Sequence, residues 1–523
     1  MQKSMTRVMF PYAVPLLGMV LGAVIAQFHI GGVFLILGSL LYGGSTGGAY
    51  WLRRLKHAEL PRLPILEWLP LLGVLSILGA FGFVPPDDLT RHMASHLHDY
   101  DYSQLYADGA VKATWSMWIG FEMVVGAVHE LLGSYWALQV VIMTSVVVAY
   151  VSVWAMLRGT LQNHPNRQLL VFTLLLLTMA SGVLWRGLLG RPEVFILAAG
   201  LFASVMRPAW WVALMLLVSP MYWLSAVYAP FALLLNTTLK ARLISGSVVL
   251  LGSLAFWMTY SGGDWFNFAQ QIQSLGSDTL LKPTETQPLS FNRFLAPTPL
   301  LLLISAVFLI FRRNPRAAGS PLIVAGWFAL SNMARYAPTI VPMLTLVVAR
   351  LMPVRLSYRL QFFILLAAFY GSYSFGLQGW QMIDRSLPAA LLNVVLPADA
   401  KVVSTTPYII PLSAPLVVLA TPMEARLASR ETRENVMMLA KNQVPCDWLR
   451  REGYTHLIEH MLKDSPTCGV AEYMYGEGRQ LHRQWRITAE DHPSFSLRPV
   501  KAPPAEVSET VSGDASPATT TLH

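Results

Sequence analysis

The chain has 523 residues, of which 54% are hydrophobic and only 13% are charged. Soluble domains carry about 25% charged residues, so this composition excludes an ordinary soluble protein and predicts a polytopic membrane protein. The net charge of +9 is not a nucleic-acid signature, because the basic residues lie in short loops between apolar segments, as the positive-inside rule produces.

The apolar segments predict a bundle of transmembrane α-helices, about thirteen in number if each pass needs ~20 mostly apolar residues and broken helices are allowed. The segment after MQKSMTRVMF has no small-residue cleavage site, so we interpret it as a retained first helix. The predicted passes lie near residues 9–26, 32–51, 65–83, 135–157, 169–184, 194–205, 210–218, 224–235, 243–260, 300–311, 322–330, 340–351 and 360–375.

The loop charges predict the orientation of this bundle. With the N-terminus inside, Lys and Arg concentrate in the inside loops, which fixes the topology. The outside loops, chiefly 84–134 and 261–298, then carry few basic residues: Arg91, Lys112, Arg186, Arg191, Lys282, Arg293 and Arg335. These arginines are informative because they run against the bias, and loop 261–298 is long enough to act as a lid.

The composition changes after residue 378, where the transmembrane domain 1–378 is predicted to end. Residues 379–500 alternate β-branched apolar runs with helical patterns, which predicts a small α/β domain outside the membrane. Its two cysteines, Cys446 and Cys468, are the only ones in the chain, and an oxidising compartment would favour a disulfide between them. Residues 501–523 are rich in Pro, Ala, Ser and Thr and are predicted to be a disordered tail.

The third predicted pass runs into a polar stretch, VPPDDLTRHMASHLHDYDYSQLYADGAVKATWSMWIGFE, at residues 84–122. Two prolines end the incoming helix, and Asp87 or Asp88 can cap the next one, on which Asp88, Arg91 and His92 share a face. The carboxylates act either as simple caps or as a general base or metal ligands facing a substrate. Ionisable groups beside a membrane favour the functional interpretation.

Histidines and aromatic residues follow the acidic pair. His92 and His96 form HxxxH without the glutamate of a zinc protease, so an interfacial amphipathic helix is favoured over a zinc site. Tyr100 and Tyr102 belong either to an interfacial aromatic belt or to a platform for a sugar or isoprenoid, and both interpretations stay open. Glu122 is a candidate second carboxylate, although a surface charge is the favoured interpretation there.

Arginines recur at two later outside loops. WRGLLGRPEV holds Arg186, Arg191 and Glu193 beside a helix start, an arrangement suited to phosphate unless Arg191 and Glu193 only form an ion pair that orients the loop. SNMARYAP adds Arg335 as a second phosphate candidate, with Tyr336 beside it.

A further polar break interrupts an apolar run at SPMYWLSAVYAP. It exposes Tyr222 where non-helical backbone is tolerated only inside protein or along a cavity, so we count this tyrosine among the candidate substrate-binding residues.

Together these motifs resemble the GT-C class of integral-membrane glycosyltransferases. The resemblance is carried by Asp87-Asp88 in PPDDLTRH, by the expected interfacial helices between 89 and 132, by GRPE and ARY, and by the C-terminal α/β domain. Members of this class move a sugar from a polyprenyl-phosphate carrier to an acceptor outside the cytoplasmic membrane. The acidic loop here follows the third pass rather than the first, and Asp-Asp replaces the Asp-Glu of the protein mannosyltransferase and aminoarabinose transferase branches.

The resemblance implies a multi-pass protein of the bacterial inner membrane with its active site on the periplasmic side. An undecaprenyl-phosphate-type donor and an extracytoplasmic glycan, lipid or protein acceptor would be its partners. Asp87 or Asp88 would act as base or hold a divalent cation, Mg²⁺ or Mn²⁺, and Arg186, Arg191 and Arg335 would neutralise the leaving phosphate. The expected substrate-binding residues are Arg91, His92, Tyr100, Tyr102, Glu122, Glu193, Tyr222 and Tyr336.

Two other functions compete with this expectation. An O-antigen ligase or polymerase would also use outside arginines but has less need of an early acidic pair. A transporter should show repeated halves with paired broken helices, and no second copy of the acidic stretch occurs in the sequence.

Overall fold

The computed structural model describes the helical bundle and several short C-terminal pieces. The described residues are 67–85, 89–97, 99–101, 115–267, 289, 291–312, 315–331, 334–384, 401–404, 416–419, 431, 434–435, 438, 446–452, 456–460 and 485–486. The first two predicted passes, most of the lid loop and the tail lie outside these residues.

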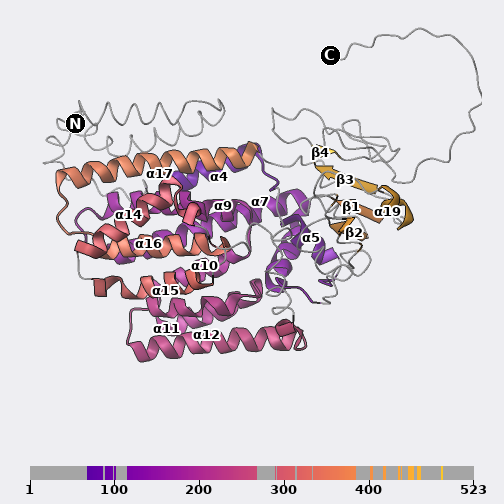
Figure 1. Ribbon diagram of the computed structural model, residues 1–523, viewed down its shortest axis with the longest axis horizontal. Helices are drawn as coiled ribbons and strands as arrows, with labels where there is room; N and C mark the ends of the chain where they lie inside the picture. The colour runs from indigo at the N-terminus through magenta and orange to yellow at the C-terminus, as the bar shows by residue number, and fades with distance from the viewer. Residues whose placement is uncertain are drawn as a thin grey trace, which may run out of the picture.

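The bundle helices run along the long axis of the molecule, as Figure 1 shows for α17, α14, α16, α15, α11 and α12. Its α-helices are α4 (Leu69–Phe81), α5 (Leu89–Leu97), α7 (Ile119–Thr160), α8 (Arg167–Thr178), α9 (Leu184–Leu188), α10 (Glu193–Leu201), α11 (Pro208–Val218), α12 (Leu239–Tyr260), α14 (Pro297–Arg312), α15 (Gly319–Leu330), α16 (Ala337–Leu351) and α17 (Tyr358–Asp384). Shorter 3-10 or π turns join them: η4 (Met179–Val183), η5 (Phe202–Ser204), η6 (Ser219–Met221), η7 (Ser225–Leu234), η9 (Phe291–Phe294), η10 (Pro315–Ala318) and η11 (Ala334–Tyr336).

The predicted passes that the structure describes differ in helix length: some lie on helices long enough to cross a membrane, and the others lie on shorter helices. Within the described residues, four segments are long and apolar enough to cross a membrane: Ile119–Thr160, Arg167–Leu188, Leu239–Tyr260 and Leu360–Gly379. The other predicted passes from 65–83 onward also fall on helices, but these are shorter than the ~20 residues of a full span. The pass predicted at 224–235 is a 3-10 helix with Pro230 inside it. The structure therefore supports a helical membrane bundle without confirming thirteen passes.

Helix α7 is longer than its predicted pass because it joins two helices across a kink. Gly133 has φ 75 and ψ 167, a conformation open to glycine alone, and it separates residues 119–132 from residues 134–160. The first part packs against α5, where Gly126 leaves room for the ring of His96; a Cβ on Gly126 would lie 2.5 Å from that ring. The second part crosses the bundle.

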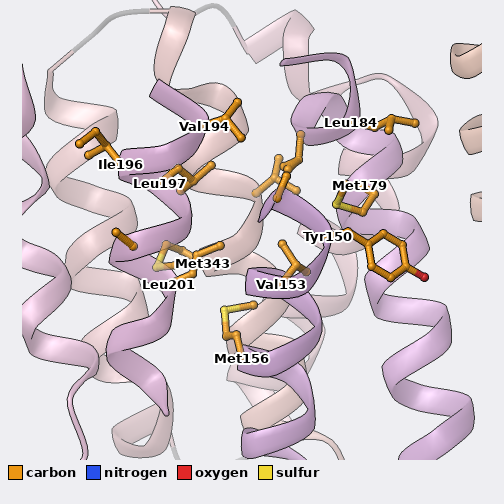
Figure 2. Close-up of a cluster of buried hydrophobic side chains, with 14 of the residues drawn as sticks. Tyr150, Val153, Met156, Met179, Leu184, Val194, Ile196, Leu197, Leu201 and Met343 are labelled. Carbon is orange, nitrogen blue, oxygen red and sulfur yellow. The ribbon is translucent and has the colours of Figure 1, made fainter. Parts of the chain in front are cut away.

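The core is built around that second part of α7. Figure 2 shows Tyr150, Val153 and Met156 of α7 beside Met179, Leu184 and Met343, with Val194, Ile196, Leu197 and Leu201 of α10 close by. Gly187 of α9 approaches Val146 so closely that a Cβ would lie 3.3 Å from the Val146 Cα. This packing fixes α9, which carries Arg186, and α10, and with them the loop between the two helices that carries Arg191.

We name the two ends of the bundle according to the predicted topology. The inner end is the one predicted to lie on the side of the N-terminus, and the outer end is the opposite one. The inner end holds a buried carboxylate, Glu67, whose Oε2 accepts hydrogen bonds from Trp154 Nε1 at 2.6 Å and Arg158 Nη1 at 3.3 Å. The Tyr150 hydroxyl donates to the backbone carbonyl of Glu67. These bonds tie the start of α4 to α7. The outer end carries α5 and the start of α7.

A small sheet stands at the end of the molecule where α5 lies (Figure 1). Its strands are β1 (Lys401–Ser404), β2 (Leu416–Leu419), β3 (His456–His460) and β4 (Trp485–Arg486), in the order β2-β1-β3-β4. β1 is parallel to β2 and β3, β4 is antiparallel to β3, and α19 (Cys446–Arg451) precedes β3. β1, β2, α19 and β3 fall in stretches predicted as strand or helix, whereas β4 was not predicted. The extent of a separate domain at 379–500 stays a prediction.

Candidate functional site

Most of the predicted site residues that the structure describes form two groups at the outer end. Arg191 lies in the loop between α9 and α10, where its backbone N–H donates to the Arg186 carbonyl at 3.3 Å. The first group is centred on the Glu122 carboxylate, which has no exposed surface. Its Oε1 lies 2.8 Å from His92 Nδ1, and its Oε2 accepts hydrogen bonds from Ser95 Oγ at 2.7 Å and Ser116 Oγ at 2.5 Å. We call Glu122 with His92, Ser95 and Ser116 the carboxylate anchor. A surface charge at Glu122 is therefore a wrong interpretation, because α5 and the Ser116 loop cover this carboxylate and supply its hydrogen-bond donors.

Aromatic side chains surround the anchor. The His92 ring meets Trp118 and Phe121 edge-on, with ring centroids 5.0 and 5.1 Å away. The Arg91 guanidinium carbon lies 4.8 Å from the Trp118 ring centroid, within the range of a cation–π interaction. Residues Leu89 to Ser95 of α5 are all buried, so α5 is not a helix with one face in water, as an interfacial amphipathic helix would be. The anchor therefore positions α5, and it holds Arg91 and His92 inside the protein.

Tyr100 extends this group toward the surface. Its hydroxyl lies 2.8 Å from His96 Nδ1, and His96 Nε2 lies 2.9 Å from the exposed carboxylate of Glu130. Burial raises the pKa of the Tyr100 hydroxyl, and the carboxylates of Glu122 and Glu130 raise it further. The phenol thus stays protonated and able to donate a hydrogen bond at neutral pH.

The second group we call the outer polar cluster: Arg186, Glu193, Tyr222, Arg335 and Tyr336. Arg335 Nη1 donates to the Tyr222 hydroxyl at 3.0 Å, and Arg186 Nη1 lies 3.0 Å from Glu193 Oε1. Burial raises the pKa of Tyr336; Tyr222 and Glu193 also raise it, whereas Arg335 lowers it. These interactions bring together residues of α9, α10, η11 and the turn after η6.

The ion-pair partner of Glu193 in the structure differs from the partner that the sequence suggested. The ion pair weighed from the sequence joined Arg191 to Glu193, whereas the structure joins Arg186 to Glu193. Both side chains are largely buried, with 11% and 17% of their surface exposed. A short loop and Pro192 separate α9 from α10, so Arg186 turns back toward the first residue of α10.

Three contacts join the segments that carry the two groups. Leu89 lies against Gly190, where a Cβ would be 2.8 Å from Leu89 Cδ2. Leu89 directly follows Asp88 in the sequence, and Gly190 directly precedes Arg191. Phe121 and Phe195 have ring centroids 5.9 Å apart, and the Trp223 N–H donates to the Met117 carbonyl at 3.0 Å. The chain next to the acidic pair and the chain next to Arg191 are thus neighbours.

Several predicted residues cannot be placed. Asp87, Asp88, Tyr102 and Cys468 lie outside the described residues, so the base, its metal and the Cys446–Cys468 disulfide stay predictions. Within the part of the chain that is described, no group of three or more His, Cys, Asp or Glu side chains is arranged to hold a metal ion. Binding of Mg²⁺ or Mn²⁺ by Asp87 and Asp88 stays a prediction.

The sequence analysis missed two members of the anchor. Ser95 could have been found, because it lies three residues after His92 on the same helix face. Ser116 gave no such signal: it precedes α7 and reaches Glu122 only because the chain turns at Met117 and Trp118.

No protein-family profile matches the chain, and no curated protein matches it. One solved structure with a similar fold is ArnT from Cupriavidus metallidurans bound to undecaprenyl phosphate, at 13% sequence identity and a TM-score of 0.48. The similarity covers 82% of this chain and 98% of that one.

Proposed function

We propose that this protein is a membrane glycosyltransferase that moves a sugar from a polyprenyl-phosphate-linked donor to an acceptor outside the cytoplasmic membrane. The observation that carries this proposal is the outer polar cluster, in which Arg335 is bonded to Tyr222 and Arg186 to Glu193. Guanidinium groups bind phosphate oxygens in a bidentate manner, and arginines fixed by neighbours suit a phosphate that gains charge as it leaves.

The membrane setting supports a lipid-linked substrate. Helices α11, α12, α14 and α15 carry large apolar side chains on their outer surfaces, including Leu217, Leu251, Phe311 and Leu330, which are 65–85% exposed. In a bilayer these side chains face lipid, where a polyprenyl chain can lie beside the bundle while its phosphate reaches the arginines at one end.

The proposed reaction is a single transfer. An acceptor hydroxyl attacks the anomeric carbon of the sugar as the bond from that carbon to the phosphate oxygen breaks, and the phosphate keeps the electron pair. Arg186 and Arg335 stabilise the charge on the departing phosphate. Asp87 or Asp88 takes the proton of the acceptor hydroxyl. Leu89 brings the end of the acidic loop next to Gly190, and so next to the loop that bears Arg191.

The test uses the full chain reconstituted in lipid nanodiscs. We expect undecaprenyl phosphate to bind, and Arg335→Ala and Arg186→Ala each to weaken that binding at least tenfold. Arg207→Ala is the matched control, because Arg207 is exposed on the loop before α11 and belongs to neither group. Surface glycans compared by mass spectrometry in cells with and without the protein identify the transferred sugar. Equal binding by all three variants, or glycans that do not change, would contradict the proposal.

A further inference from the structure

The helix that carries Arg186 is broken by a π turn just before it reaches the outer end. α8 ends at Thr178, η4 covers Met179–Val183, and α9 begins at Leu184. Within η4, Ser181 has φ −91 and ψ 26, and Gly182 has φ 105 and ψ −9. Single π turns inside α-helices are frequent at functional sites, and here the break also changes the direction in which α9 presents Arg186.

The break removes the usual partner of one backbone carbonyl. In an α-helix the Leu184 N–H would bond to the carbonyl of Ala180, but here it bonds to Met179 instead. Two side chains donate to the Ala180 carbonyl: Thr298 Oγ1 from the first turn of α14, at 3.3 Å, and Gln378 Nε2 from α17. Three segments of the bundle thus meet at one carbonyl.

The side-chain amide of Gln378 has a second polar atom, Oε1, near the π turn. Its Nε2 faces a carbonyl, which accepts and cannot donate, so the other end of the amide is the acceptor Oε1. Oε1 is buried and has no hydrogen-bond partner within the described parts of the chain. Buried acceptors of this kind are rare in folded proteins, and each one needs an explanation such as a bound donor.

The position of the amide relative to the outer polar cluster suggests what that donor is. Gly182 lies against Pro338, since a Cβ on Gly182 would be 3.7 Å from Pro338 Cγ, and Pro338 follows Arg335 and Tyr336 by a few residues. Arg186 follows Ala180 by six residues, on the short helix α9 that begins directly after the π turn. A phosphate at the arginines places the sugar attached to it, or an acceptor carbohydrate attacking the anomeric carbon of that sugar, on the side of the cluster where Gln378 lies.

We propose that Gln378 Oε1 accepts a hydrogen bond from a carbohydrate hydroxyl group, so that Gln378 contributes to substrate specificity. This inference rests on the proposed function. The hydroxyl belongs to the sugar of the donor or to the acceptor, and the two sources give different results in the experiment below.

The experiment compares Gln378→Leu with Thr298→Val in the nanodisc protein. Both substitutions remove one donor to the Ala180 carbonyl, but only the first removes the acceptor Oε1, so Thr298→Val is the matched control. The probes are undecaprenyl phosphate alone and undecaprenyl phosphate carrying glucose, galactose, mannose or N-acetylglucosamine. Gln378→Glu is a second variant, because it keeps an acceptor while it loses the bond to the carbonyl.

If the hydroxyl is on the donor, Gln378→Leu weakens binding of a sugar-bearing probe about 3- to 10-fold, the size expected for one lost hydrogen bond. Binding of undecaprenyl phosphate without a sugar does not change. If it is on the acceptor, donor binding stays constant and the KM for the acceptor rises by a similar factor. In both cases Thr298→Val has little effect, and Gln378→Glu retains more binding than Gln378→Leu.

Other outcomes overturn the inference. Equal losses in Gln378→Leu and Thr298→Val, for all probes alike, would show that Gln378 only holds the π turn. That result would leave the proposed function intact, since the native protein would still bind sugar-bearing probes. Failure of the folded native protein to bind any probe would instead overturn the proposed function and this inference together.

Discussion

Arg335 donates a hydrogen bond to the hydroxyl of Tyr222 at 3.0 Å, although 113 residues separate the two in the sequence. The bond joins η11 to the turn after η6, two segments that each interrupt an apolar run. The hydroxyl of Tyr222 is neutral, so this bond orients the guanidinium without cancelling its positive charge.

Tyr222→Phe tests the importance of this bond. Without the hydroxyl, the guanidinium of Arg335 is less well fixed, and we expect affinity for undecaprenyl phosphate to fall about 3- to 10-fold with little change in thermal stability. Tyr370→Phe, in α17, removes a hydroxyl from a helix that carries no member of the outer polar cluster. If both variants bind the lipid like the native protein, the bond does not position Arg335 for phosphate.

The carboxylate anchor predicts a large difference between two neighbouring glutamates of α7. Glu122→Gln replaces a buried carboxylate with an amide, whose NH₂ group then faces other hydrogen-bond donors. Each hydrogen bond to the carboxylate that is lost in this way should cost roughly 1.5–3 kcal/mol of stability. Glu130→Gln, at a glutamate that is 66% exposed and bonded to His96, should cost only about 0–1 kcal/mol. Thermal unfolding in detergent measures both, and limited proteolysis between α5 and α7 should accelerate in the first variant alone. Similar melting temperatures would contradict a structural role for Glu122.

Gly190→Ala tests the contact between the acidic loop and the arginine loop. Gly190 has φ 64, and a Cβ there would lie 2.8 Å from Leu89 Cδ2, so the substitution both strains the backbone and displaces Leu89. Gly133→Ala is the matched control: its φ is 75, but no atom lies within 4 Å of the added Cβ. Both substitutions place a non-glycine residue at a positive φ, which should cost about 1–3 kcal/mol in each variant. We expect transfer activity to fall further in Gly190→Ala, and equal activity per folded molecule would rule out a role for this contact.

Asp87→Asn and Asp88→Asn address the predicted base. Loss of a general base costs ~100- to 10,000-fold in rate, so one of these variants should lose transfer while its binding of undecaprenyl phosphate persists. Asp99→Asn is the control, because it removes a carboxylate from the same polar stretch. Asp99 has a φ of 51, a backbone conformation that asparagine tolerates. Near-normal turnover in both aspartate variants, with an inactive arginine variant, would favour the ligase alternative.

Glu67→Gln probes the inner end of the bundle. Its carboxylate is buried against Trp154 and Arg158, and losing the charge should destabilise the protein by roughly 1.5–3 kcal/mol. Because Glu67 belongs to the other end of α4, donor affinity per folded molecule should not change. A change in affinity without a change in stability would show that the two ends are coupled.

The sequence predicted the helical elements better than their lengths and interruptions. Apolar runs located helices such as α12 and α16, because burial in lipid and in the core imposes the same composition. The π turn at Met179–Val183 could not be located in this way. It lies within one continuous apolar run, in which only Ser181 and Gly182 differ from the residues around them. Its geometry depends on Thr298 and Gln378, which arrive from distant helices.

The candidate site shows the same limit. Outside arginines could be recognised because they run against the charge bias, and the structure brings Arg186 and Arg335 into one cluster through their neighbours. The burial of Glu122 could not be predicted from composition, since a lone glutamate beside aromatic residues is ordinarily a surface charge. What decides its burial is the set of donors that α5 and Ser116 place around it.

The carboxylate anchor also has a consequence for the order in which the chain is made. His92, Ser95 and Ser116 all precede Glu122, so a ribosome delivers every described donor before the carboxylate that needs them. The inner carboxylate is in the opposite situation, because Trp154 is synthesised 87 residues after Glu67 and Arg158 later still. During insertion, the outer end can close as soon as α7 begins to emerge, whereas the Glu67 carboxylate gains its donors from Trp154 and Arg158 only when α7 is almost complete.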